Sequence, residues 1–308
     1  MDARLGQRLA DVSLTAGCVA EPLPVCYLNG EFLPLAEARV SPLDRAFLYG
    51  DAVYEVMPVY GGRPFRFAAH AERLAGSLAA ISMEDPHSAE EWRALLGSLI
   101  ERNGGDDCYL YWQVTRGTQS GRTHAPLPEI PRTVFAFCAP WPQPPADLAA
   151  QGVRCVTAPD TRWSRCDIKS TALLANVLLR QLSVESGAAE TILLRDGELT
   201  EASAAAVHVV LGGEVLMPPN SRRILRGTTR GAVEEVAARA AIPCRVQPIS
   251  ESQLRAADEV WISSATREVQ PVTVLDGHAV SSGRPGPMWR RVYEEFQRYK
   301  QELAGTPW

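Results

Sequence analysis

Lysine is nearly absent from this chain of 308 residues. The chain has 31 basic residues other than histidine, and all of them are arginine except Lys169 and Lys300. Arginine keeps its proton in proteins, whereas a partly buried lysine can lose its proton and form an imine with a carbonyl group. Lys169 lies in mid-chain beside apolar sequence, in CDIKSTALLANVLL, while Lys300 lies in the polar segment QRYKQELAG. Lys169 is therefore a candidate nucleophile. Composition alone makes a second interpretation equally good, in which Lys169 is a lysine at the start of a helix that extends its side chain along the surface.

Two segments in the second half of the chain carry groups that complement such a lysine. Glu201, in LTEAS, follows a predicted hairpin. It is either an acid that faces a ring nitrogen or an exposed glutamate at a strand end. Gly227, Thr228 and Thr229 begin a predicted helix in RGTTRGAVEEV. The N–H groups and the dipole at a helix start favour a phosphate, although threonine is also a common N-cap residue. An imine lysine, an acid and a phosphate site are together what pyridoxal phosphate (PLP) requires.

The first half of the chain predicts antiparallel strands and two helices. Asn29-Gly30 in CYLNGEFLPL and Gly61-Gly62 in VYEVMPVYGGRPFRF lie between apolar runs and favour two-residue hairpin turns. HAERLAGSLAAI and EEWRALLGSLIERNGG have apolar residues at helical spacing. YLYWQVTRG and TVFAFCA are typical of further strands.

The second half predicts hairpins mixed with helices. The helices are expected in STALLANVLLRQLSVESG, in TTRGAVEEVAARAA and from about Met288 onwards. Asp196-Gly197 and Gly212-Gly213 mark two hairpin turns, VTVLDGHAV is typical of a third hairpin, and EVWISSA of a strand. The predicted class is α+β, with mainly antiparallel sheets and flanking helices.

A proline-rich stretch divides these two halves. APWPQPPADLAAQG cannot pair as a central strand and indicates an interdomain linker at residues 141–150. The expected organisation is an N-terminal extension at 1–24, a small domain at 25–140 and a large domain at 151–308 that carries Lys169.

Composition limits the classes of partner. A net charge of −5 argues against broad binding to nucleic acid or to an anionic membrane, and no run approaches a membrane span. The start MDARLGQRLADVSL does not resemble a secretory signal. The seven cysteines are scattered without C-x-x-C spacing, which is typical of free thiols in a reducing compartment, so we expect a cytoplasmic protein.

Motifs for other chemistries do not compete with this interpretation. The chain has no Walker, H-E-x-x-H zinc or G-x-G-x-x-G dinucleotide motif, and we expect no metal site. His70, His87, His208 and His278 are expected to be structural or surface residues rather than ligands.

An ordered series of segments resembles the fold-type IV family of PLP enzymes. This family includes D-amino-acid aminotransferases, branched-chain aminotransferases and aminodeoxychorismate lyases. The similarity runs from about Tyr27 to Gln297, and each segment is weak alone although the ordered set is specific. The segments are YLNGEFLPL, SPLDRAFLYGDAVYEV, HAERL, DIKS, LTEAS, LRGTTR and SSATREVQPV.

The resemblance implies a role for each cofactor residue. Lys169 would form the imine (Schiff base) with PLP and transfer the proton, and Glu201 would face the pyridine nitrogen. The residues implied for the phosphate end of the cofactor are Arg73, Gly227, Thr228, Thr229 and Thr266.

The substrate end resembles the D-amino-acid branch. Arg122 and His124 in TRGTQSGRTHAP match an Arg-x-His pair that captures the substrate α-carboxylate, and a guanidinium can hold a carboxylate with two hydrogen bonds. Branched-chain enzymes usually carry a tyrosine five residues after the lysine, where this chain has Leu174.

Three departures from the family pattern stand beside this match. Phe47 in Arg45-Ala46-Phe47, which by the resemblance would also contact the substrate, replaces the tyrosine of an R-G-Y segment, so a phenol near the substrate carboxylate is missing. The usual glycine and serine-asparagine run after the glutamate is replaced by Ala202, Ser203, Ala204, Ala205 and Ala206, which removes hydroxyls near the cofactor, and Ala265 stands where a phosphate-binding threonine is common. We therefore expect looser cofactor retention and an altered substrate range.

The expected function is transfer of an amino group from a D-amino acid similar to D-alanine to a 2-keto acid, by a ping-pong mechanism. An aminodeoxychorismate lyase or an (R)-selective primary-amine transaminase on the same fold is the alternative within the family. A non-enzymatic binding protein that retains the fold is the alternative from another class, favoured by the alanine run and opposed by Lys169. The family also implies a homodimer with each active site near the subunit interface.

Overall fold

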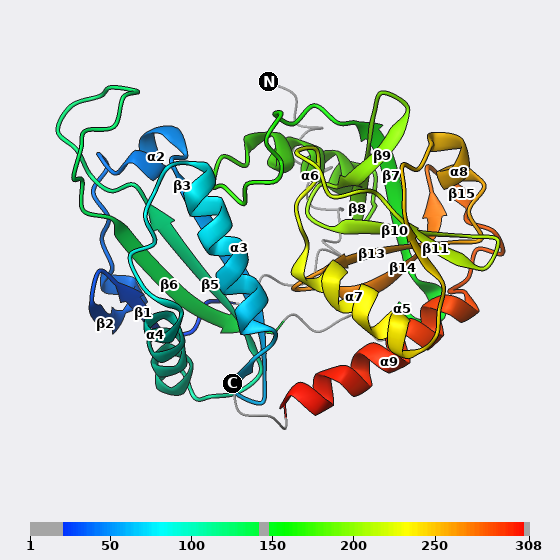
Figure 1. Cartoon of the computed structure of the whole chain (residues 1–308), viewed down its shortest axis with the longest axis horizontal. Helices are drawn as coiled ribbons and strands as arrows, with labels where there is room; N and C mark the ends of the chain where they lie inside the picture. The colour runs from blue at the N-terminus through cyan, green and yellow to red at the C-terminus, as the bar shows by residue number, and fades with distance from the viewer. Residues whose placement is uncertain (1–20, 142–147, 305–308) are drawn as a thin grey trace, which may run out of the picture.

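The computed structural model describes residues 21–141 and 148–304. These residues form two sheets that lie side by side, each with its own helices (Figure 1). The six-stranded sheet comes from the first half of the chain, and the nine-stranded sheet comes from residues after position 152. In the described ranges, no helix combines the length and the apolar character needed to cross a membrane.

The six-stranded sheet is antiparallel throughout, in the order β2-β1-β6-β5-β3-β4. Its strands are β1, Val25–Leu28; β2, Glu31–Pro34; β3, Ala52–Tyr60; β4, Arg63–Pro64; β5, Cys108–Thr115; and β6, Thr133–Pro140. Asn29 and Gly30 turn the chain between β1 and β2 with φ of 50° and 103°, a backbone conformation that asparagine and glycine tolerate.

Two long helices cover this sheet. They are α3, Phe67–Ala80, and α4, Ala89–Arg102, and they follow the short elements η1, Leu35–Glu37, and α2, Arg45–Tyr49. Ser88 and Glu91 form a capping box that begins α4. Trp92 and Leu99 on α4 pack with Trp112 on β5 in one buried cluster, so the apolar faces predicted from helical spacing meet the sheet.

The nine-stranded sheet is mixed, in the order β12-β11-β10-β13-β14-β7-β8-β9, with β15 paired to β14. Its strands are β7, Val153–Pro159; β8, Glu190–Arg195; β9, Glu198–Ala202; β10, Ala206–Leu211; β11, Glu214–Met217; β12, Cys244–Val246; β13, Glu259–Ser264; β14, Glu268–Leu275; and β15, His278–Ala279. β7 runs parallel to both β8 and β14, and β12 runs parallel to β11, while the other pairs are antiparallel.

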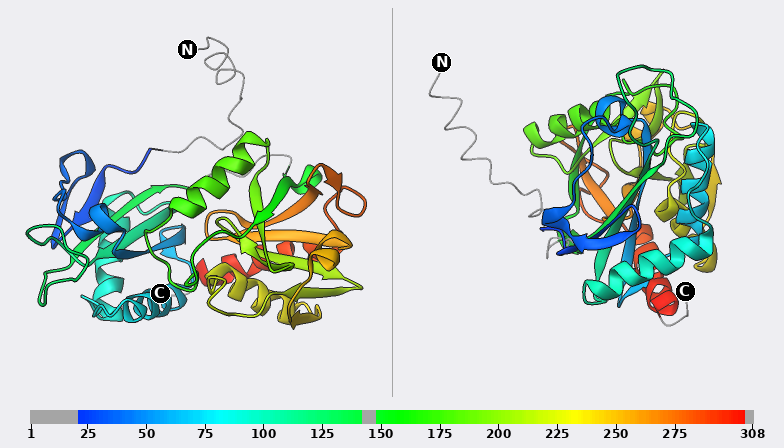
Figure 2. Two further views of the ribbon diagram at one scale, coloured as in Figure 1. Left: turned by 90° about the horizontal axis from the view of Figure 1, so that it is seen from above. Right: turned by 90° about the vertical axis from the view of Figure 1, so that its left-hand side faces the viewer.

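Helices lie on both faces of the larger sheet. They are α5, Leu148–Gln151; α6, Leu174–Glu185; α7, Thr228–Arg239; α8, Glu251–Arg255; and α9, Pro287–Ala304. α7 and α9 pack together on one face over Trp261, and α6 lies on the opposite face (Figure 2).

The predicted α+β class with mainly antiparallel sheets and flanking helices is confirmed. The sequence did not predict strand β7 or the short elements η1, α2, α5, α8 and β12. α6 begins at Leu174, later than the segment STALLANVLL suggests, because Ser170 and Thr171 pair with β3 instead. The division into domains at 25–140 and 151–308 stays a prediction. Residues 1–20 of the expected extension and 142–147 of the expected linker lie outside the described residues.

The segment that carries Lys169 joins the two sheets. The N–H of Tyr54 donates to the carbonyl of Lys169, and the N–H of Thr171 donates to the carbonyl of Ala52, both at 3.0 Å. Val53 on β3 forms an isolated antiparallel bridge with Ser170. Lys169 is therefore held by its own backbone at the junction between the sheets.

Candidate functional site

A cavity of about 550 Å³ lies at this junction. Its walls come from β3, the Lys169 segment, the start of α6, the end of β9, the start of α7 and the end of β13. The predicted cofactor residues that line it are Lys169, Arg73, Glu201, Gly227, Thr228, Thr229 and Thr266. Residues far apart in the sequence thus meet around one space.

Lys169 lies in this cavity as a half-buried amine. Its Nζ is 4.3 Å from the centre of the Tyr54 ring, and no ion pair or hydrogen bond of this Nζ is found within the described ranges. Lys300, by contrast, pairs with Glu268 and donates to Gln297 at 3.1 Å. Because α6 begins only at Leu174, the alternative of a lysine at a helix start does not hold.

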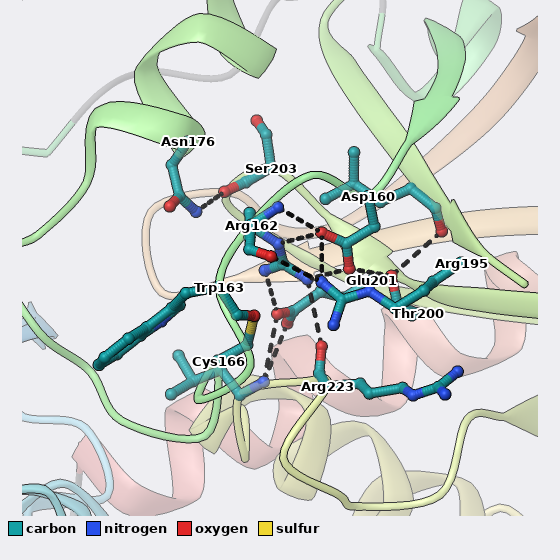
Figure 3. A network of polar contacts seen from close by, with 12 residues as sticks. Asp160, Arg162, Trp163, Cys166, Asn176, Arg195, Thr200, Glu201, Ser203 and Arg223 are labelled. Carbon is teal, nitrogen blue, oxygen red and sulfur yellow. Dashed lines mark hydrogen bonds and ion pairs between the residues drawn. The ribbon is translucent and has the colours of Figure 1, made fainter.

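Glu201 forms a buried ion pair at the floor of the cavity (Figure 3). Nη1 of Arg162 donates to Oε1 of Glu201 at 2.5 Å, and the N–H of Leu225 lies 3.2 Å from each carboxylate oxygen. Burial raises the pKa of Glu201, against the lowering effect of the Arg162 charge. The Arg162 charge and the Leu225 N–H favour the ionised form of Glu201, and an ionised carboxylate is the form that stabilises a protonated ring nitrogen.

Arg162 is fixed in turn by Asp160 (Figure 3). Nε and Nη2 of Arg162 each donate to Asp160 at 2.9 Å, and Arg195 and Thr200 also contact that carboxylate at 3.0 Å. Burial alone would lower the pKa of Arg162, but its hydrogen bond with Asp160 and the charge of Glu201 raise it. Arg162 was not predicted from the sequence, because nothing local distinguishes it from the other arginines.

The start of α7 presents backbone donors to the cavity. Gly227 is the N-cap residue and no side chain caps this end among the described residues, so the simple threonine N-cap considered from sequence is wrong. Thr228 and Thr229 therefore occupy the first helical turn, where N–H groups have no partner within the helix. A Cβ at Gly227 would lie 3.2 Å from the Cβ of Arg230, so the close packing favours glycine there.

Arg73 is held at the same end by a buried carboxylate. Its Nε and Nη2 donate to the two oxygens of Glu55 at 2.7 Å, and its Nη1 donates to the carbonyl of Arg226 at 3.1 Å. His70 lies 2.8 Å from the same carboxylate. Against the effect of burial, Arg73 and His70 lower the pKa of Glu55 to about 2. The result is a fixed positive group beside the start of α7.

The predicted substrate residues do not line this cavity. His124 lines a second, smaller pocket of about 290 Å³, together with Arg45 and Tyr49. The Arg122 guanidinium lies 5.4 Å from the centre of the Tyr49 ring, whereas Phe47 is 76% exposed. The two pockets adjoin, because Trp163, Ser170 and Ala172 line both.

Arg45 positions the loop that carries Arg122 and His124. It is buried, pairs with Asp51 at 2.7 Å, and donates to the carbonyls of Thr123 and His124 at 2.8 Å. This role of Arg45 was not predicted from the sequence, although Arg45 belongs to the segment that resembles the family.

The residues that line the cavity fit PLP. An amine without an ion pair in the described residues, a buried carboxylate held by Arg162, and a helix start beside Arg73 stand in one space. These are the groups that an aldehyde, a ring nitrogen and a phosphate would respectively use.

Comparison with known proteins agrees with this geometry. Residues 52–275 match the model of the family described as Amino-transferase class IV. A D-alanine aminotransferase from Staphylococcus aureus (strain MSSA476) is 37% identical over 273 residues, which are 89% of this chain and 96% of the relative. One from Listeria monocytogenes serotype 4b is 36% identical over 270 residues, 87% of this chain and 93% of the relative.

Solved structures of the same fold include two branched-chain aminotransferases. The Escherichia coli enzyme has a TM-score of 0.83 and 26% identity, with 90% of this chain and 94% of that chain covered. The enzyme from T.th., solved with pyridoxamine 5'-phosphate, also has a TM-score of 0.83, with 27% identity over 92% and 95% of the two chains. The family match spans most of the chain and includes the segment around Lys169, so the chain belongs to the class IV aminotransferase family.

Proposed function

We propose that this protein is a PLP-dependent transaminase that moves an amino group from a D-amino acid, such as D-alanine, to a 2-keto acid. The observation that carries the proposal is the likeness to D-alanine aminotransferases over 89% of the chain. The pocket beside the Lys169 cavity supports the same activity. His124 and Tyr49 line it, and the Arg122 guanidinium lies over the Tyr49 ring, so an imidazole and a cationic donor for a carboxylate stand at this pocket.

PLP, when bound, supplies a ring that accepts the electron pair left at the substrate Cα. Glu201 would hold a proton at the ring nitrogen, and Arg162 would keep that carboxylate in place. The first turn of α7, with Arg73, would bind the phosphate. Lys169 would hold the cofactor covalently at rest, and its freed Nζ would move the proton from the substrate Cα to C4′ of the cofactor.

Handedness follows from three fixed points, the first of which is the amino nitrogen that the cofactor would hold. Arg122 and His124 would hold the α-carboxylate on one side, and Lys169 would take the Cα proton from another. Only one enantiomer then presents its Cα–H to Lys169 while its side chain avoids the lysine. The proposed preference for D-amino acids rests on this arrangement and on the named relatives.

An exposed apolar face supports the proposal that the protein is a homodimer. Leu174, Leu178 and Leu182 lie four residues apart on α6 with Val177 beside them, and all four are exposed. A contiguous apolar face of this kind usually marks a protein interface. Val177 also lines the Lys169 cavity, so a second copy over α6 would border the active site.

We further propose a cytoplasmic location, because the six cysteines in the described ranges are all unpaired.

The chain offers a direct test of the attachment residue because it has only two lysines. Borohydride reduction of the PLP-loaded protein should fix the cofactor to the Lys169 peptide, as detected by mass spectrometry. Lys169→Ala should abolish both this label and transamination. Lys300→Ala is the matched control and should keep both, since Lys300 pairs with Glu268. A label on Lys300 in the wild type would contradict the assignment.

Handedness can be measured with the cofactor itself. The yellow PLP-loaded protein should bleach when mixed with D-alanine and stay yellow with L-alanine, because only the D isomer presents its Cα–H to Lys169. Absorbance spectra in single-turnover conditions report the half-reaction without a keto-acid acceptor. Bleaching by L-alanine alone would contradict the preference, and no bleaching by either would favour the lyase or primary-amine alternative.

Loss of the proposed carboxylate donor should weaken substrate binding. Arg122→Ala should raise the KM for D-alanine by roughly 10-fold or more with a smaller change in kcat, because a hydrogen bond to a charged group contributes about 1.5–3 kcal/mol. Arg290→Ala, an exposed arginine on α9, is the control. An unchanged KM in Arg122→Ala would remove the proposed role.

The dimer proposal predicts the effect of a charge on α6. Leu178→Glu should convert the wild-type dimer to a monomer in sedimentation velocity, because the charge would be buried without a partner. Val246→Glu, at an exposed apolar position on β12, should leave the dimer intact. A wild-type monomer at micromolar concentration would overturn the proposal.

A further inference from the structure

A buried histidine lies directly behind the cavity wall. His208 on β10 is fully buried, and its Nε2 is 2.8 Å from Oγ of Ser263 on β13. Ser263 is 2% exposed and lines the cavity that contains Lys169. His208 itself does not line the cavity, so it can act on a bound molecule only through Ser263.

The hydrogen-bond partners of His208 decide where its proton lies. Nδ1 of His208 is buried and has no partner in the described part of the chain. A buried N–H without an acceptor is rarer than a buried acceptor without a donor, so the proton of the neutral ring belongs on Nε2. Burial and the charge of Arg230 lower the pKa of His208 to about 3, so the ring is neutral at ordinary pH.

This tautomer sets the direction of the Ser263 hydroxyl. With Nε2–H donating to Oγ, the hydroxyl hydrogen of Ser263 is not used by His208 and can be donated elsewhere. If His208 carried its proton on Nδ1 instead, Ser263 would donate to the ring and offer the cavity only a lone pair. A neutral His208 protonated on Nε2 therefore turns Ser263 into a donor.

Ser263 stands beside the start of α7. It pairs in register with Ala206, and a Cβ at Gly227 would lie 3.9 Å from the Ala206 side chain. Thr228 and Thr229 line the same cavity as Ser263. Arg230, the next residue, is buried; its Nε pairs with Glu234 at 2.9 Å, and its Nη2 has no partner among the described residues.

We propose that His208 is a positioning residue that holds the Ser263 hydroxyl as a hydrogen-bond donor to the cofactor phosphate. The pair supplies a hydroxyl near the position where Ala265 lacks one. This inference concerns retention of the cofactor and does not depend on which amino acid the enzyme uses.

The test is the affinity of the full-length protein for pyridoxamine phosphate, measured by equilibrium dialysis. This ligand binds without a covalent bond, so the contribution of the phosphate is fully visible. Ser263→Ala and His208→Phe should each raise its Kd by roughly 10-fold, since a hydrogen bond to a charged group contributes about 1.5–3 kcal/mol. Neither variant should change the Kd for pyridoxamine, which lacks the phosphate.

A double-mutant cycle separates positioning from general loss of structure. If His208 acts through Ser263, His208→Phe should have no further effect on the Kd in the Ser263→Ala background. His208→Gln should restore much of the affinity, because its amide N–H can occupy the place of Nε2–H. It also serves as the test variant if His208→Phe does not fold.

Three results would overturn the inference. They are an unchanged Kd for pyridoxamine phosphate in Ser263→Ala, equal loss of affinity for pyridoxamine and its phosphate, and an additive effect of the two substitutions. None of these measurements uses turnover, so failure here is distinguishable from failure of the proposed D-amino-acid activity.

Discussion

Backbone hydrogen bonds between β3 and the segment around Lys169 create the site. Tyr54 and Thr171 supply the N–H donors, and the chain on both sides of Lys169 is thereby held against the smaller sheet. The same segment leads into α6, which packs on the larger sheet. The cavity therefore opens where one stretch of chain is shared by two sheets, and neither sheet alone could enclose it. Lys169 lies in the wall because its own carbonyl makes one of these bonds.

The buried carboxylates around the cavity are paired with arginines, whereas the Lys169 amine has no such partner among the described residues. Glu201 is neutralised by Arg162, and Glu55 by Arg73, with further hydrogen bonds that satisfy the remaining atoms. The attraction within a buried ion pair offsets the loss of hydration only when the geometry of the pair is fixed. These two pairs therefore form rigid ends to the cavity. Within the described residues the Lys169 amine has an aromatic ring for a neighbour instead of a carboxylate.

The sequence predicted those parts of the site whose signals are local. Lys169 stands out because lysine is rare here, and the helix that starts at Thr228 was visible from its spacing. The contacts that hold these residues were not predictable, because Arg162 and Arg45 reach their partners across 39 and 78 positions of sequence. One arginine among many carries no local mark of such a contact. The late start of α6 was missed for the same reason, since pairing with a distant strand competes with helix propensity at Ser170.

Departures from the family pattern remove hydroxyl groups from one part of the cavity wall. Two serine hydroxyls remain nearby, and each is held by a buried neighbour. Alanine occupies positions 204–206 and 265 on the cavity wall. The Ser203 hydroxyl donates to buried Glu190, so that proton is directed away from the cavity and into a carboxylate. Ser263 differs because its neighbour is a neutral histidine that donates, which leaves the serine proton uncommitted. Whether a cavity hydroxyl serves a ligand thus depends on the partner behind it, and sequence similarity at the hydroxyl position alone does not reveal that partner.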